Sequence, residues 1–199
     1  MSKSYLHLFA ATLLFFTFFG CGTQPLVLTE GNLNFLKGEE LINVEYQYDN
    51  LMVGEMTEEA YLKRKVGEKN SDEPGTGDKW VKRWFDDREE IFQPKFEKSL
   101  NEKLETKAIF GSGLQDTEYT LVLKTTFIEP GWNIFISNQP ANIQGIILFV
   151  ETDNPQNVIA VLPIDNCEEK SGSYAVASRI SYAYACAGIR LAVTIINYL

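Results

Sequence analysis

Hydrophobic and polar residues alternate most clearly over residues 41–48, where apolar side chains occupy every second position. This period of two is typical of a strand with one buried face. Apolar runs over residues 119–128, 143–152 and 158–164 are rich in Val, Ile, Leu and Phe, and each also predicts a strand. The polar turn at residues 153–155 separates the last two runs, so we expect an antiparallel hairpin there.

Two central segments have the three-and-four spacing of amphipathic helices. Thr57 precedes two Glu residues, which predicts a helix start, because a hydroxyl caps the first turn and the helix dipole favours carboxylates there. Residues 78–104 carry an aromatic and Leu stripe that we expect to be core. A kink or break is expected at Gln93, because Pro94 cannot continue a helix without loss.

The chain closes with an Ala-rich segment, residues 173–199, whose apolar residues share one helical face. Arg179 and Arg190 interrupt the segment, and the remaining apolar run is too short to span a bilayer, so we expect a buried helix. Runs of strands rather than strict alternation with helices predict an α+β fold. We expect a twisted, mostly antiparallel sheet of four to five strands with helices packed on one face.

The N-terminus has a separate pattern: Lys3 precedes an apolar run over residues 6–19. A secretory signal has an apolar core of roughly 7–15 residues, whereas a spanning helix needs about 20. We therefore predict three parts: a signal peptide over residues 1–20, a tether over 21–30 and a single α+β domain over 31–199.

The junction Gly20-Cys21 resembles the lipobox of bacterial lipoproteins. That resemblance implies cleavage before Cys21, a diacylglycerol on its sulfur and an acyl chain such as palmitate on its amine. An ordinary secretory signal with a chance cysteine is the alternative. The mature part is similar to uncharacterised envelope lipoproteins of Bacteroidetes, which implies a fold and a compartment and no activity. Residues 22–25 lack the acidic cluster associated with surface export in that group, which favours an outer-membrane anchor facing the periplasm.

Charge and composition exclude several classes of function. Loss of Lys3 with the signal takes the net charge from −9 to −10, and an acidic chain without a basic block argues against nucleic-acid partners. The one histidine, His7, lies in the signal, which excludes His-based catalytic triads and His-ligated metals from the mature protein. No segment has a cofactor-binding or metal-binding pattern, so we expect neither group.

Two cysteines besides Cys21 have an open assignment. Cys167 ends an apolar run and Cys186 lies within the closing helix. An oxidising envelope could join them as a disulfide. Two separately buried thiols are the alternative, because a free cysteine behaves as a small hydrophobe.

The strongest binding candidate is the region over residues 129–142, between the apolar runs 119–128 and 143–152. Trp132 follows a Pro-Gly turn there and lies near Asn133, Asn138 and Gln139. A loop aromatic flanked by amides suits a protein or glycan partner. The alternative is that Trp132 covers the edge of the core, and the sequence does not separate these two interpretations.

These observations predict a lipid-anchored cell-envelope protein that acts as a non-enzymatic binding or assembly module for an envelope protein or glycan. The alternative is a carboxylate-based periplasmic hydrolase acting on glycans, since two carboxylates suffice for that chemistry without histidine. Glu129 and Glu151, near strand ends, are the carboxylates that such an enzyme would use. Solvation of the protein surface explains most of the other acidic residues.

Overall fold

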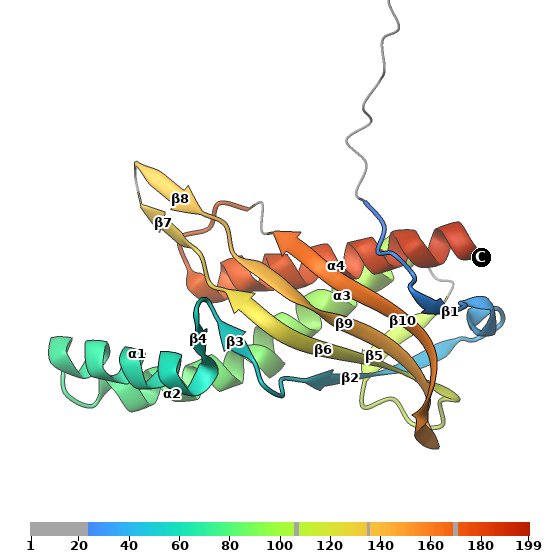
Figure 1. Cartoon of the computed structure of the whole chain (residues 1–199), viewed down its shortest axis with the longest axis horizontal. Helices are drawn as coiled ribbons and strands as arrows, with labels where there is room; N and C mark the ends of the chain where they lie inside the picture. The colour runs from blue at the N-terminus through green and yellow to red at the C-terminus, as the bar shows by residue number, and fades with distance from the viewer. Residues whose placement is uncertain (1–23, 106–107, 135, 169–170) are drawn as a thin grey trace, which may run out of the picture.

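The computed structural model describes residues 24–105, 108–134, 136–168 and 171–199. Cys21 and the predicted signal peptide lie outside these residues. The described chain forms two layers, a curved sheet and a set of helices that cover one of its faces (Figure 1). A two-stranded hairpin projects beyond one end of the sheet, and a pair of helices extends past the same end (Figure 1).

The main sheet has eight strands in the path β1-β10-β9-β6-β2-β5, with β3 and β4 attached beside β6. The strands are β1 (Glu30–Gly31), β2 (Leu41–Gln47), β3 (Met52–Val53), β4 (Met56–Thr57), β5 (Ile109–Ser112), β6 (Tyr119–Glu129), β9 (Asn142–Glu151) and β10 (Asn154–Glu168). The separate hairpin consists of β7 (Trp132–Ile134) and β8 (Ser137–Gln139). The predicted long strands are therefore present, and β9 and β10 form the expected antiparallel hairpin.

The α+β class is confirmed, but the expectation of a mostly antiparallel sheet of four to five strands is wrong. The sheet is mixed, because β2 runs parallel to both β5 and β6 and β3 runs parallel to β6. Three helices lie between β2 and β5, and they return the chain to the end of the sheet where β2 began. A strand that follows such a crossover enters parallel to its predecessor. Four strands of two to four residues raise the count, and segments that short show no readable period.

The helices are α1 (Glu58–Asp72), α2 (Thr76–Asp87), α3 (Gln93–Leu104) and α4 (Val176–Tyr198), with a short 3-10 turn at Asn34–Leu36. Thr57 caps α1 as predicted, because its hydroxyl accepts the Ala60 N–H at 3.3 Å. In place of the predicted kink or break at Gln93, one wide π turn lies at Arg88–Phe92. Pro94 then lies in the first turn of α3, where its missing N–H has no helical partner to lose.

The core lies between the sheet and helices α3 and α4. Gly188 brings α4 close to α3, since a Cβ at this position would lie 2.5 Å from the Phe96 carbonyl oxygen. By length and composition α4 could cross a membrane, yet 61% of its most apolar stretch is buried inside the protein. This packing agrees with the prediction of a buried closing helix.

Residues 24–30 of the predicted tether are described, and Leu26 and Thr29 among them contact the folded domain. Leu26 is buried in the core, and its carbonyl accepts the Thr194 hydroxyl at 2.9 Å. Thr29 donates its N–H to the Val161 carbonyl at 2.9 Å and so leads into β1. These contacts with α4 and β10 show that the segment touches the fold at Leu26 and Thr29, and the division into signal, tether and domain stays a prediction.

Candidate functional site at the root of the hairpin

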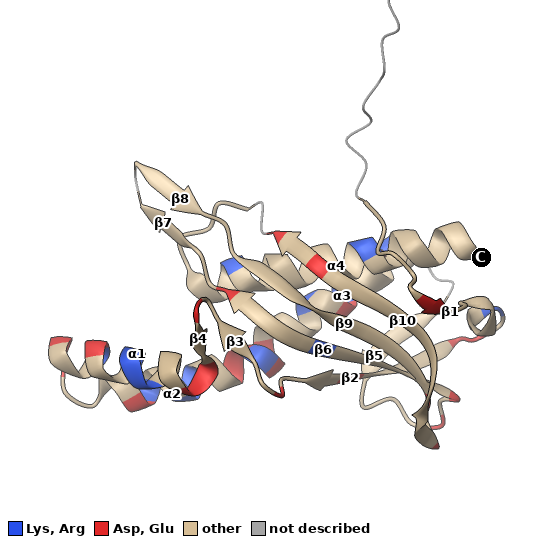
Figure 2. Cartoon of the chain, in the orientation of Figure 1, with Lys and Arg blue, Asp and Glu red and all other residues tan. Residues whose placement is uncertain are grey.

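The β7–β8 hairpin leaves the sheet where β6 ends and β9 begins (Figure 1). Its strands pair antiparallel, with Trp132 opposite Gln139 and Ile134 opposite Ser137. Because side chains alternate along a strand, Trp132 and Ile134 lie on one face of the hairpin and Asn133 lies on the other. Figure 2 shows that the hairpin carries no charged residue, in contrast to helices α1 and α2 beside it.

A buried arginine from α4 holds the root of the hairpin. The Arg179 side chain is 3% exposed and donates to the carbonyls of Pro130 and Gly131 at 3.2 and 2.8 Å. It also donates to the carbonyls of Ser173 and Tyr174 at 3.1 and 2.7 Å. Among the described residues, no ion pair involves Arg179. Its charge is therefore solvated by backbone carbonyls from two segments, which fixes the hairpin root against the start of α4.

The Pro-Gly turn is held from its other side by the end of β6. The Glu129 carboxylate accepts the Gly131 N–H at 2.9 Å. Gly131 has a φ of +62°, and a Cβ there would lie 2.4 Å from the Gln139 carbonyl oxygen, so only glycine fits this position without strain. Trp132 is therefore mounted on a well-defined turn.

A groove of about 320 Å³ runs between this turn, the β3–β4 turn and the first half of α1. Trp132 lines it from the hairpin and is 42% exposed. Tyr61 lines it from α1, with the Arg64 guanidinium 5.4 Å and the Lys65 ammonium 6.0 Å from the Tyr61 ring centre. Burial raises the pKa of Tyr61 to about 12, so the phenol is neutral at physiological pH. Glu129 also lines the groove, which thus combines aromatic faces with groups of both charges.

The four residues predicted for binding separate onto the two faces of the hairpin. The Trp132 indole N–H donates to the Gln139 side-chain oxygen at 3.0 Å, so these two lie together on the face that carries Ile134. Asn133 donates instead to the Gly172 carbonyl at 2.6 Å, and Asn138 is its partner in the hairpin. Trp132 therefore lines the groove and Gln139 holds its indole, whereas Asn133 helps to attach the hairpin to the loop before α4.

Sequence reasoning missed Tyr61, Arg64 and Arg179 as parts of this site. Tyr61 and Arg64 lie on α1, about 70 residues before Trp132, and no local pattern connects them. Arg179 left a signal that could have been used, because an arginine inside an otherwise apolar helix requires a buried partner.

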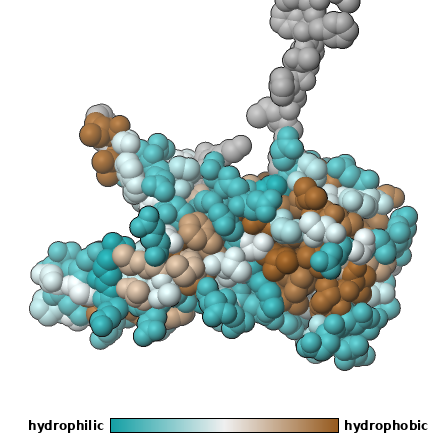
Figure 3. Space-filling view, viewed as in Figure 1, coloured by the Kyte–Doolittle hydropathy of each residue, from teal (hydrophilic) through white to brown (hydrophobic). Residues whose placement is uncertain are grey.

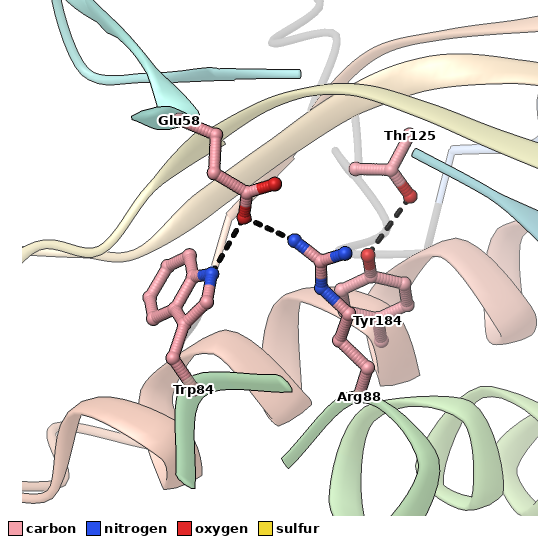
Figure 4. Close-up of polar contacts among 5 residues, drawn as sticks. All are labelled: Glu58, Trp84, Arg88, Thr125 and Tyr184. Carbon is pink, nitrogen blue, oxygen red and sulfur yellow. Dashed lines mark hydrogen bonds and ion pairs between the residues drawn. The ribbon is translucent and has the colours of Figure 1, made fainter. Parts of the chain in front are cut away.

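Figure 4 shows the polar cluster that sets the position of α1, and with it one wall of the groove. Glu58, in the first turn of α1, accepts the Trp84 indole N–H at 2.6 Å and pairs with the Arg88 guanidinium. Beside this pair, the hydroxyls of Thr125 and Tyr184 are 2.8 Å apart and link β6 to α4. Trp84 is buried, which confirms that this part of the predicted aromatic stripe belongs to the core.

The two described cysteines lie close together, near the Arg190 side chain that also contacts Gln24. Cys167 lies at the end of β10 and Cys186 in the middle of α4. A hydrogen bond between the two thiols, together with burial, raises the pKa of Cys167. The predicted disulfide pair therefore consists of neighbours in space, and both cysteines are thiols in this structure.

The carboxylates suggested for a hydrolase do not meet. Glu129 is paired with Asn142 at one end of the β6–β9 ladder, whereas Glu151 is paired with Tyr119 at the other. Ten strand residues separate these ends, or about 33 Å, and a glycosidase pair lies roughly 5–9.5 Å apart. Among the described residues, no cluster of Cys, Asp or Glu could hold a metal ion.

No protein-family model and no curated protein matches this chain. Two solved structures of PelC dodecamers from Paraburkholderia phytofirmans are similar to it at a low level. The dodecamer of a PelC point variant is 10% identical with a TM-score of 0.41, covering 83% of this chain and 95% of that one. The PelC dodecamer in a second crystal form is 9% identical with a TM-score of 0.40, covering 84% of this chain and 98% of that one.

Proposed function

We propose that this chain is a lipid-anchored cell-envelope protein that binds an envelope protein or glycan without chemical change. The observation that carries the proposal is the exposed Trp132 indole, held by Gln139 at the mouth of a groove. Exposed aromatic side chains in fixed orientations are typical of binding sites, because they give a large contact area with little loss of conformational entropy.

The groove suits a ligand with an apolar face and polar edges. The Trp132 ring offers a stacking surface, Arg64 and Lys65 offer hydrogen-bond donors, and Glu129 offers an acceptor. A pyranose ring has this character, as does an aromatic or aliphatic side chain flanked by peptide groups. The rigid turn before Trp132 also favours binding, because Arg179 and Glu129 fix the turn before any ligand arrives and less conformational entropy is lost on binding.

A carboxylate-based hydrolase is the second candidate, because Glu55 and Glu129 both line the groove. The hydrogen bond from the Gly131 N–H already engages Glu129, so this carboxylate has a structural role in the turn. Release of reducing sugar from envelope glycans by the wild type, abolished in Glu55→Gln, would favour the hydrolase over the binding module.

The anchor of the proposal is Cys21, which lies outside the described residues. Acyl chains on this residue would hold the protein to the membrane, with each buried CH₂ contributing about 0.8 kcal/mol. The Cys21→Ser variant is expected to leave the membrane fraction after detergent-free lysis. Retention of that variant in the membrane would contradict the anchor.

The binding role is tested by crosslinking and affinity capture from intact envelopes with the wild type and Trp132→Ala. Tyr198→Ala is the matched control, because Tyr198 is an exposed aromatic at the far end of α4. Loss of the captured partner in Trp132→Ala alone, with an unchanged melting temperature, supports the proposal. Equal capture by both variants refutes the groove as the binding site, and a large fall in melting temperature assigns Trp132 to the stability of the fold.

A further inference from the structure

The tip of the β7–β8 hairpin exposes aliphatic side chains to solvent. Ile134 is 54% exposed and Ile136 is 86% exposed. Figure 3 shows a small apolar patch at the end of the projecting hairpin, separate from the other apolar surface in that view. No residue from Trp132 to Asn142 is charged. Such a surface has an unfavourable hydration free energy and is expected to be covered in the working protein.

The tip is held away from the fold by a rigid support. In the part of the chain that the structure describes, the hairpin is paired with no strand of the main sheet, and a two-stranded hairpin alone is marginally stable in water. The hydrogen bonds from Arg179 to Pro130 and Gly131, and from Asn133 to Gly172, fix its direction. These hydrogen bonds therefore hold the hairpin in a position that exposes its apolar tip to solvent.

The tip also points toward the side of the molecule on which the described chain begins. The described chain begins at Gln24, whose carbonyl accepts the Arg190 side chain at 3.0 Å. The blue segment where the described chain begins and the β7–β8 hairpin lie toward the same upper side of the molecule in Figure 1. Two residues separate Cys21 from Gln24, so the three Cα–Cα steps between them span at most about 11 Å. A bilayer that holds acyl chains on Cys21 is therefore within reach of the same side.

We propose that Ile134 and Ile136 insert into the bilayer that holds the lipid on Cys21, as a second and non-covalent contact. The proposal rests on the lipid anchor of the proposed function. A bilayer fits the tip better than an acidic or basic protein surface, because the hairpin offers no charge for such a partner to pair with. Isoleucine favours the hydrocarbon region, and Trp132 with Gln139 at the root suits the interfacial layer, where indoles concentrate.

This second contact would give the protein a fixed orientation. A lipid on a flexible segment attaches a protein and leaves its rotation free, whereas two separated contacts define which face meets the membrane. The groove at the root of the hairpin would then open at the level of the membrane surface. Its ligand would be presented there, at a fixed height above the lipid.

The test uses the full lipidated chain in phosphatidylcholine vesicles, with and without bromine atoms on the lipid acyl chains, which quench nearby tryptophan emission. Ile136→Trp places a reporter at the tip. Val158→Trp is the matched control, because Val158 is 44% exposed and lies on β10 near the β9–β10 turn, at the opposite end of the sheet. Flotation of the vesicles first measures whether each protein is bound.

Ile136→Trp is expected to lose emission in the brominated vesicles beyond the loss seen for the wild type, while Val158→Trp shows no added loss. Ile136→Asp is expected to float with the vesicles through Cys21 and to show less quenching of Trp132 than the wild type. Flotation without added quenching in Ile136→Trp overturns insertion of the tip and leaves the anchor intact. Failure of the wild type to float overturns both the anchor and the insertion that depends on it.

Discussion

Replacement of Arg179 by Met tests the central structural claim, that one buried guanidinium holds the hairpin root. The substitution keeps an unbranched side chain of similar length and removes the donors to four backbone carbonyls, those of Pro130, Gly131, Ser173 and Tyr174. Each hydrogen bond to a charged group contributes about 1.5–3 kcal/mol. The contributions do not add, because burial of the guanidinium itself costs several kcal/mol.

The net loss expected for Arg179→Met is about 3–5 kcal/mol, because each buried carbonyl left without a donor costs about 1–3 kcal/mol and relief from burying the guanidinium offsets part of that cost. Arg190→Met is the matched control, because Arg190 also lies on α4 and also donates to backbone carbonyls, those of Gln24 and Asn166, at the protein surface. The expected loss in the free energy of unfolding for Arg190→Met is about 1 kcal/mol, because water can replace the Arg190 side chain at exposed carbonyls with little loss of free energy. Arg179→Met should also lower capture of the groove ligand, because the turn that positions Trp132 loses its hydrogen bonds to the Arg179 side chain.

Urea unfolding followed by circular dichroism measures both variants, and the free energy of unfolding is obtained by linear extrapolation. A loss below about 1 kcal/mol in Arg179→Met, or a loss equal to that of Arg190→Met, would refute the reasoning. The hairpin root would then be held by its own backbone pairing and by Glu129, with Arg179 contributing only packing.

Gly188→Ala is expected to lower the free energy of unfolding by about 1–3 kcal/mol, because the added methyl group would press on the α3 backbone. Gly67→Ala, on open helix surface, should raise it by about 0.5–1 kcal/mol. Equal effects of the two variants in urea unfolding would contradict the close helix contact. The pKa of Tyr61 is raised from 10.0 to about 12, so its contribution to stability is complete below pH 10 and is lost as the pH rises through about 12. Tyr61→Phe is expected to lose less stability than the wild type over this alkaline range. A Tyr61 phenol that titrates near pH 10 in the folded protein would disprove the shift. Diamide oxidation should join Cys167 and Cys186, close a loop of roughly 20 residues and stabilise by about 3 kcal/mol; an unchanged thiol count in denaturant would exclude the pairing.

Much of the local structure could be predicted from the sequence. The strand at β2, the long strands β6 and β9 and the cap at Thr57 all follow from residues within one turn or one strand of each other. Alternation, β-propensity and a hydroxyl before two carboxylates act over a few residues, and they leave a readable pattern for that reason. The exposure of Trp132 could not be predicted in this way, because the sequence did not decide whether its side chain is buried.

The candidate site required the tertiary structure, because its parts come from distant segments. The sequence by itself determined which residues form strands and helices, and it singled out Trp132 and the two cysteines as residues of interest. Only the fold placed Tyr61 and Arg64 beside Trp132, directed Arg179 under the hairpin, and separated Glu129 from Glu151 by the length of a strand. The parallel entry of β2 into the sheet has the same origin. Contacts between residues far apart in the chain depend on how whole elements pack, and this packing leaves no periodic mark in the sequence.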